Sequence, residues 1–219
     1  MNELFDKIFF INLEERKDRL VQILKEFEKM GIKNFERVEG IRPTINFLKE
    51  NNILYSNLKY WNRNNDYVIG SVGRKLSHYN VIKIAKERGY KKILILEDDI
   101  FFTHTKEETV KILKSLSQED SNMIYLGGND LSNLRIIETN CKYLRRVYDM
   151  YFTHAYIINS NIYDYVLENL QNYNSELDTF YVEKIQTHGK CYKTVPYLVD
   201  QKFGFSDILK ENKNYSSLG

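Results

Sequence analysis

The stretch that decides the fold runs from Lys91 to Phe102 and reads KKILILEDDIFF. Its apolar run, Ile93 to Leu96, is uninterrupted, which is typical of a strand buried on both faces of a sheet. Three carboxylates follow at once: Glu97, Asp98 and Asp99. A strand that ends in this way places its charges at the carboxyl edge of the sheet, where open α/β folds bind ligands.

Like charges so close together raise one another's pKa unless a cation neutralises them. Magnesium or manganese is the natural counter-ion, because hard divalent ions prefer oxygen ligands. The alternative interpretation is an ordinary solvated turn or the N-cap of a following helix. Since Ile100, Phe101 and Phe102 continue the chain with apolar side chains, the cluster is not a free surface loop, and the sequence favours a functional site.

Length and composition favour one α/β domain. The chain has 219 residues, of which 42% are hydrophobic, enough for an ordinary core. We expect a single domain over residues 1–219, with a frayed tail after about residue 209. The 32 basic residues stand against 30 acidic ones, and a net charge of +2 without a dense basic block gives no reason to expect a nucleic-acid partner.

The two cysteines, Cys141 and Cys191, match no metal-ligand spacing. Reduced thiols are favoured over a disulfide, which the sequence leaves open. The apolar run near the N-terminus is too short and too interrupted for a signal peptide or a membrane anchor. We therefore expect no transmembrane segment and a cytoplasmic location, either free or peripheral at a membrane.

The first part of the chain predicts a strand over 7–13 and an amphipathic helix over 14–30. Asn12 lies at their junction, and Arg16 and Arg19 lie on the first helical turns. Guanidinium groups at a strand-to-helix junction suit a diphosphate. The alternative is that each arginine is an exposed partner of Glu15 or Asp18.

A second block, GSVGRKLSH at 70–78, precedes a predicted helix over 79–88 that Ser77 or a neighbour would cap. Gly70 and Gly73 ahead of a helix N-terminus, with Arg74 and Lys75 beside them, suit an anion, although the spacing is that of neither the P-loop nor the dinucleotide fingerprint. His78 is either a helix-surface residue or a polar group that faces a ligand.

The rest of the chain alternates between predicted strands and predicted helices. We predict strands over 34–38, 122–126, 151–158 and 191–199, the last broken by Pro196, and helices over 45–54, 106–116, 161–170 and from 175 to 186. Residues 131–149 are predicted to be irregular or a hairpin. The region 42–67 is polar, and its Tyr55, Tyr60 and Trp61 belong either to the core or to an acceptor site.

Eight segments then stand in a recognisable order: INLEERKDRL at 11–20, EGI at 39–41, GSVGRKLSH at 70–78, LILEDDI at 94–100, YLGG at 125–128, THAYIIN at 153–159, LD at 177–178 and PYLVDQKFGFSDI at 196–208. In this order they resemble glycosyltransferase family 25, the lipooligosaccharide and procollagen galactosyltransferases. The resemblance implies a GT-A type fold, a Rossmann-like mixed α/β sheet flanked by helices.

The resemblance also implies a metal site and a nucleotide-sugar donor. Asp99 is then the metal ligand, with Asp98 as a second ligand or a ribose contact, and Mn²⁺ or Mg²⁺ bridges the phosphates of a UDP-sugar. His188, Gln201 and Asp207 stay open as a third ligand, and His154 and Tyr156 are expected to line the site. The residues expected to contact the donor are Asn12, Arg16, Arg19, Gly70, Lys75, Ser77, His78, Glu97, Asp98, Gln201 and Ser206.

Family members of this type invert the anomeric centre, which needs a base for the acceptor hydroxyl. Asp178 is the candidate, Glu176 is the fallback, and a helix N-cap is the structural alternative for Asp178. The resemblance implies transfer of galactose or glucose to a glycan, a lipooligosaccharide or a protein. The competing hypotheses are a catalytically silent nucleotide-sugar or carbohydrate-binding module and a metal-dependent phosphatase, which the four scattered histidines disfavour.

Two departures from the family limit this resemblance. Arg74 and Lys75 stand where the family often has small or apolar residues, so the resemblance leaves their role toward phosphate open. We expect neither the signal peptide nor the second module of the animal collagen enzymes in this chain, so the resemblance does not imply collagen as the acceptor.

Overall fold

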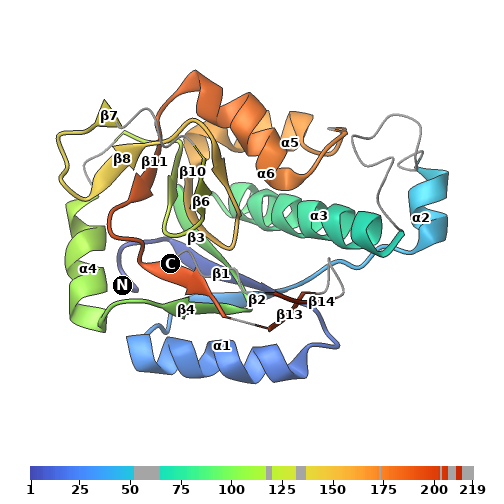
Figure 1. Ribbon diagram of the computed structural model, residues 1–219, viewed down its shortest axis with the longest axis horizontal. Helices are drawn as coiled ribbons and strands as arrows, with labels where there is room; N and C mark the ends of the chain where they lie inside the picture. Colours follow the sequence, from blue (N-terminus) through green and yellow to red (C-terminus); the bar gives the residue numbers. More distant parts are fainter. Residues whose placement is uncertain are drawn as a thin grey trace.

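The fold is a mixed sheet of eight strands covered by helices on both faces, as seen in the computed structural model (Figure 1). The structure describes residues 1–51, 65–116, 120–131, 137–172, 174–202, 204–206 and 211–213. The strand order is β2-β1-β3-β10-β5-β11-β8-β7. The bounds are β1 Lys7–Asn12, β2 Phe35–Glu39, β3 Lys92–Glu97, β5 Met123–Tyr125, β7 Ile137–Glu138, β8 Leu144–Arg146, β10 Ala155–Asn159 and β11 Cys191–Thr194.

The predicted strand at the acidic stretch is confirmed as β3, the last strand of the parallel part of the sheet. It pairs with β1, which pairs with β2, all in parallel, so the three strands end at the same edge. On its other side β3 pairs with β10 in the antiparallel sense. The predicted fold class, a mixed α/β sheet flanked by helices, is therefore confirmed.

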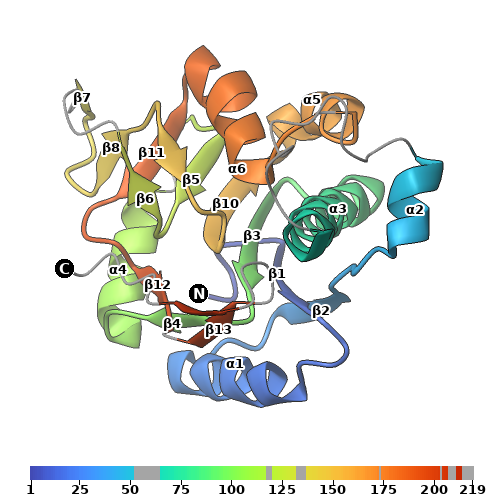
Figure 2. The same ribbon diagram turned by 45° about the vertical axis from the view of Figure 1, so that its right-hand side comes forward.

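Alternate residues of β3 enter two different cores. Leu94 and Leu96 belong to the core beneath α1 (Lys17–Met30) and α4 (Lys106–Ser115). Ile93 and Ile95 belong to the core beneath α3, α5 (Tyr163–Asn169) and α6 (Leu177–Phe180), the helices of the opposite face (Figure 2). Each such side chain, fully buried, stabilises the fold by about 1.5–3 kcal/mol. The uninterrupted apolar run of the sequence reflects this two-sided burial.

Helix α3 spans Asn65–Glu87, so the helix predicted over 79–88 is present, but its predicted start and its cap by Ser77 were wrong, because the helix already begins at Asn65. Gly70 and Gly73 lie inside the helix and form no anion cradle at its N-terminus. A Cβ on Gly73 would lie 2.3 Å from the carbonyl oxygen of Ile41. The Ser77 hydroxyl donates to the carbonyl of Gly73 (2.7 Å) and accepts from the amide of Ile41 (2.8 Å). The glycine lets α3 pack directly on the chain that follows β2, which offsets its low helix propensity.

Two other predicted elements are divided in the structure. The predicted strand over 151–158 is two strands, β9 (Met150–Tyr151) and β10, and Phe152 between them has a φ of 68°. The predicted strand over 191–199 is β11 and then β12 (Val199–Gln201), which pairs with β4 (Ile100–Phe102). This pairing places the strand that follows the acidic turn beside Gln201.

The remaining elements agree with the predictions in outline. α2 (Ile45–Glu50) is shorter than predicted, and α6 begins after its N-cap Glu176, so Asp178 is not the cap. β7 and β8 form the predicted hairpin, and both cysteines are free thiols. The other bounds are β6 Asn129–Asp130, β13 Gly204–Ser206, β14 Glu211–Lys213, η1 Ser160–Ile162, η2 Tyr181–Ile185 and η3 Gln186–His188. Among the described helices, none combines the length and apolar character needed to cross a membrane.

Candidate functional site

A cavity of about 430 Å³ lies at the carboxyl edge of β1, β2 and β3 and is bordered by residues of α3 and α6. Open α/β sheets bind ligands at this edge. The side of α3 that lines the cavity follows helical spacing, since residues three and four apart share a helix face. It consists of Tyr67, Gly70, Ser71, Arg74, Ser77 and His78.

The acidic turn after β3 is held by one arginine. Nη1 of Arg19 lies 2.9 Å from Oδ1 of Asp98 and 3.1 Å from Oδ2 of Asp99. The side-chain amide of Asn12 donates to Oδ2 of Asp98 (2.7 Å), and that of Gln201 donates to Oδ1 of Asp99 (3.3 Å). Asp99 lines the cavity, whereas the oxygens of Asp98 face Asn12 and Arg19.

This single guanidinium does not fully compensate the two carboxylates. Burial and the neighbouring charge of Asp99 raise the pKa of Asp98 to about 6, although Arg19 and Asn12 act against the shift. Burial also raises the pKa of Asp99, against the opposing charge of Arg19. A cation beside Asp99 would relieve this excess of negative charge.

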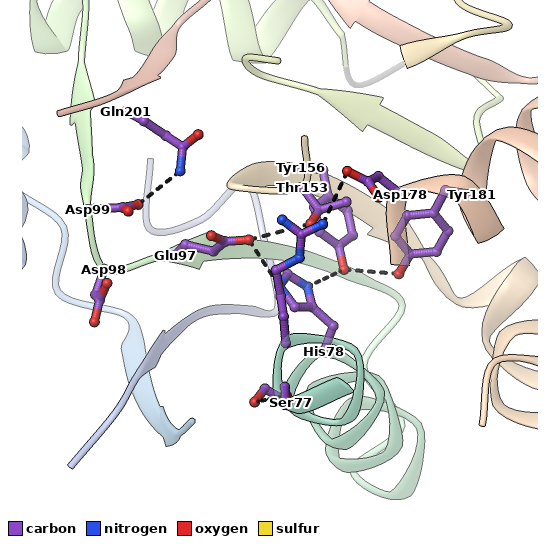
Figure 3. A network of polar contacts seen from close by, with 12 residues as sticks. Ser77, His78, Glu97, Asp98, Asp99, Thr153, Tyr156, Asp178, Tyr181 and Gln201 are labelled. Carbon is purple, nitrogen blue, oxygen red and sulfur yellow. Dashed lines mark hydrogen bonds and ion pairs between the residues drawn. The ribbon is translucent and has the colours of Figure 1, made fainter. Parts of the chain in front are cut away.

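Glu97 occupies the middle of the cavity wall, between Asp99 and Asp178 (Figure 3). Its Oε1 lies 3.4 Å from Nε2 of His78 and accepts from the hydroxyl of Thr153 (3.4 Å). Burial by itself would raise the pKa of Glu97, but the hydrogen bond from His78 and the charge of Arg74 outweigh burial and lower the pKa to about 2. Glu97 is therefore ionised at neutral pH.

Behind Glu97 a chain of polar contacts runs into the core. Nδ1 of His78 lies 2.9 Å from the hydroxyl of Tyr156, which lies 3.1 Å from the hydroxyl of Tyr181 (Figure 3). Burial lowers the pKa of His78, although Glu97 acts in the opposite direction. A neutral imidazole that donates from Nε2 to Glu97 and accepts at Nδ1 from Tyr156 fits both neighbours, and we assign that tautomer. His78 therefore orients Glu97.

A second ion pair joins α3 to α6 at the other side of Glu97. Nη2 of Arg74 lies 3.1 Å from Oδ2 of Asp178, and both residues line the cavity. Burial of the guanidinium is outweighed by the charges of Asp178 and Glu97, which raise the pKa of Arg74. The sequence offered Arg74 as part of an anion cradle but not among the expected donor contacts, because the family often has a small or apolar residue at this position. The signal that identifies it is its position one helical turn before His78.

The structure brings most of the predicted site residues together. Those that line the cavity are Arg19, Gly70, Ser77, His78, Glu97, Asp99, Asp178 and Gln201. Asp98 lies directly behind this wall and contacts Arg19, and Asn12 in turn donates to Asp98. Of the three residues left open as a third metal ligand, Gln201 contacts Asp99, and His188 is exposed on η3, away from the cavity lining.

Some predicted residues are not part of the cavity wall. Arg16 pairs with Asp18 (2.9 Å), the interpretation that the sequence offered as the alternative. Lys75 is buried and is not among the residues that line the cavity, and burial lowers its pKa to about 8 against the charge of Glu176. His154 and Tyr156 are buried behind the wall. The side chain of Ser206, with Asp207, Tyr55, Tyr60 and Trp61, lies outside the described residues.

Comparison with families of known proteins gives one match over most of the chain. The sequence model of the family described as "Glycosyltransferase family 25 (LPS biosynthesis protein)" matches residues 5–181. These residues include β1, β3, α3 and α6, the elements that form the cavity.

Individual relatives cover a smaller part. The human protein "Procollagen galactosyltransferase 2" is 33% identical over 129 residues, which are 56% of this chain and 21% of that protein. The "Glycosyltransferase 25 family member" of Drosophila melanogaster is 32% identical over 131 residues, again 56% of this chain and 21% of that protein. The matched part of the chain thus spans about one fifth of the length of these relatives.

Among solved structures, "a glycosyltransferase involved in the glycosylation of the major capsid of PBCV-1" is 10% identical and has a TM-score of 0.42. The match covers 82% of this chain and 74% of that one. This likeness is too distant to support a conclusion about chemistry.

Proposed function

The chain belongs to glycosyltransferase family 25, and on that premise we propose that it is an inverting, metal-dependent hexosyltransferase that uses a UDP-sugar donor. The hexose is galactose or glucose, and the acceptor is a hydroxyl group on a glycan, a lipooligosaccharide or a protein. Galactose is favoured because the human relative is named a galactosyltransferase.

One observation carries the proposal: a single cavity holds two differently charged centres on either side of Glu97. At one side Asp99 and Arg19 form a site with one cationic group and excess carboxylate. At the other side Asp178 forms a pair with Arg74. Transfer of a sugar from a diphosphate needs two groups in one place. One must stabilise the leaving group, and the other must take a proton from the acceptor.

The residues at the acidic turn fit a metal that is held mainly by its substrate. The part of the chain that the structure describes contains no group of three or more His, Cys, Asp or Glu side chains arranged to hold an ion. Magnesium-like ions are often held by one or two carboxylates together with waters and substrate phosphates. Asp99, with Gln201 beside it, would supply the protein ligands, and Asp98 would hold Arg19 and Asn12 in place. When bound, the metal would neutralise charge on the departing diphosphate.

The protein's own groups perform the remaining steps. Asp178 accepts the proton of the acceptor hydroxyl while the acceptor oxygen forms a bond to the anomeric carbon. The bond between that carbon and the phosphate oxygen breaks, and its electron pair leaves with the nucleoside diphosphate. Attack from the side opposite the leaving group inverts the configuration. Arg19 adds a positive charge beside the diphosphate, and Arg74 keeps the carboxylate of Asp178 in position.

The test begins with donor binding. Thermal stability is measured with UDP-galactose, UDP-glucose and other activated sugars, with and without manganese, because a ligand that binds only the folded state stabilises it. Donor hydrolysis and transfer to acceptors are then measured for the wild-type chain and for Asp99→Asn. We expect metal-dependent stabilisation by one UDP-hexose and turnover that depends on Asp99.

Two results would contradict the proposal. Full turnover by Asp99→Asn at saturating manganese would remove the metal site from this position. Binding of a donor without hydrolysis or transfer to any acceptor in a broad panel would favour the alternative, a nucleotide-sugar-binding module without catalytic activity.

A further inference from the structure

We infer that the part of the cavity beside Asp178 is an acceptor subsite for a sugar in the pyranose form, with Tyr151 and Phe152 as its aromatic wall. This inference rests on the proposed function and deepens it, because it selects a carbohydrate among the hydroxyl acceptors. Both residues line the same cavity as Arg74 and Asp178. Strand β9, which carries Tyr151, packs beside α6, which carries Asp178.

The backbone at Phe152 is the first observation. Its φ of 68° lies in the left-handed region, which is unfavourable for a bulky aromatic residue. Such strain persists only where the surrounding structure imposes it, and it gathers at functional sites. The conformation ends β9 and turns the chain back towards β10, with the ring of Phe152 at the cavity wall.

The neighbouring turn holds this conformation in place. β9 pairs with β6, with Tyr151 opposite Asn129. Gly128, just before β6, has a φ of 151°, and a Cβ there would lie 2.4 Å from Cε of Met150 and 2.6 Å from the carbonyl oxygen of Tyr151. Only glycine permits this close approach of the two segments. The aromatic wall is therefore part of a packed support and not a loose loop.

The polar groups beside the rings are the second observation. The hydroxyl of Tyr67 donates to Oε1 of Glu176 (3.0 Å), and the hydroxyl of Ser175 donates to Oε2 (3.0 Å). These bonds occupy both oxygens of Glu176, the fallback base. Asp178 pairs through Oδ2 with Arg74, and its Oδ1 accepts from the amide of Thr179 (3.1 Å). Both carboxylates line the cavity and are fixed in position beside the two aromatic residues.

This combination of side chains matches the chemistry of a pyranose. One face of such a ring presents C–H groups, which pack on an aromatic ring, while its rim presents hydroxyls that bond to carboxylates and guanidinium groups. A lipid chain would need an apolar wall without Arg74 and Asp178. Burial, with the charge of Asp149 and a hydrogen bond to it, raises the pKa of Tyr151, so its hydroxyl stays protonated.

The experiment uses the full chain with UDP-galactose and manganese, and methyl β-galactoside, methyl β-glucoside and methyl α-mannoside as acceptor probes. Phe152→Gly removes the ring and suits the positive φ, and Phe152→Asn is a second variant that tolerates the same backbone region. Tyr165→Ala, which removes an exposed ring on α5, is the control. Steady-state kinetics give KM for acceptor and donor separately.

We expect wild-type transfer to at least one pyranoside. In both Phe152 variants the ratio of acceptor KM to donor KM should rise by about tenfold, because an aromatic contact is lost. In Tyr165→Ala the ratio should stay at the wild-type value. An unchanged ratio in both Phe152 variants overturns the inference, as does transfer to hydroxyl-bearing peptides when no pyranoside is accepted. Failure of the wild-type chain to bind any UDP-hexose is a different result, because it overturns the proposed function itself.

Discussion

Two arginine–carboxylate centres in this cavity differ in charge balance. Arg19 pairs with two carboxylates, Asp98 and Asp99. Arg74 pairs directly with Asp178, and its positive charge also acts on Glu97. Glu97 has a second partner in His78. The first centre therefore lacks positive charge, and burial with mutual repulsion raises the pKa of Asp98 to about 6. The second centre is held in place by direct contacts. An arginine–carboxylate pair thus leaves negative charge uncompensated at one side of Glu97 and holds an oriented carboxylate at the other.

The largest expected effect comes from breaking the second centre. Asp178→Asn should lower the rate of transfer by about 10²–10⁴-fold, the usual contribution of a general base, while donor binding changes little. Single-turnover transfer and donor-induced thermal shifts measure the two quantities. Asp164→Asn, which removes a surface partner of Lys86, is the control. If donor affinity falls as much as the rate, Asp178 has a binding role instead.

Breaking the first centre should have the next largest effect. Asp99→Asn should lower manganese-dependent turnover by about a hundredfold, because the variant loses the carboxylate that faces the cavity. A titration of activity with manganese measures it. Asp98→Asn is the matched variant at the neighbouring position, and its loss should be smaller because Asp98 acts through Arg19 and Asn12. Equal losses in the two variants would make both residues direct ligands.

A smaller effect on donor binding should distinguish Arg19, in α1, from Arg16, the residue just before α1. Arg19→Ala should raise the donor KM by about tenfold, since a charge-assisted contact to the diphosphate is lost, while manganese affinity does not decrease. Arg16→Ala removes a pair with exposed Asp18 and should change the donor KM by less than about twofold. The two values come from steady-state kinetics at saturating manganese. Similar effects of both variants would contradict the assignment of Arg19 to the first centre.

The smallest effect is a pH dependence of the first centre. The pKa of Asp98, about 6, lies above its ordinary value, so the carboxyl takes up its proton as the pH falls through 6. The ionised fraction then drops from about three-quarters at pH 6.5 to about one-quarter at pH 5.5, and manganese affinity should fall about threefold over this range. Calorimetric titration of the metal measures it. The dependence should be weaker in Asp98→Asn, and an equal dependence in that variant would assign it to another group.

The predictions from sequence worked best where a pattern is local. The apolar run before Glu97 predicted β3 because burial on both faces leaves no polar position in the strand. The same argument failed for α3. Its glycines disfavour a helix in isolation, but Gly73 permits a contact with the chain at Ile41 that no local pattern contains. The break between β9 and β10 was missed for a similar reason, because the positive φ of Phe152 depends on its packing against Gly128.

The candidate site was likewise predicted in part. Asp99, Asp178 and His78 were selected by motif and do line one cavity, whereas Arg74 was considered only for an anion, and its pairing with Asp178 could not be predicted because the two residues are distant in the sequence. Arg16 and Arg19 were equivalent candidates in the sequence. Only α1 in its folded position, packed against the sheet, directs Arg19 to Asp98 and Asp99 and leaves Arg16 with Asp18.

The sequence by itself determined the type of the central strands, the position of the carboxylates at a strand end and the family of the chain, because each depends on residues close together or on the order of short motifs. The tertiary structure alone decided which charges meet. An ion pair such as Arg74 with Asp178 joins residues on separate elements, and its formation depends on how α3 and α6 pack against each other. Packing of this kind depends on many small contacts along the whole chain, which no short segment records.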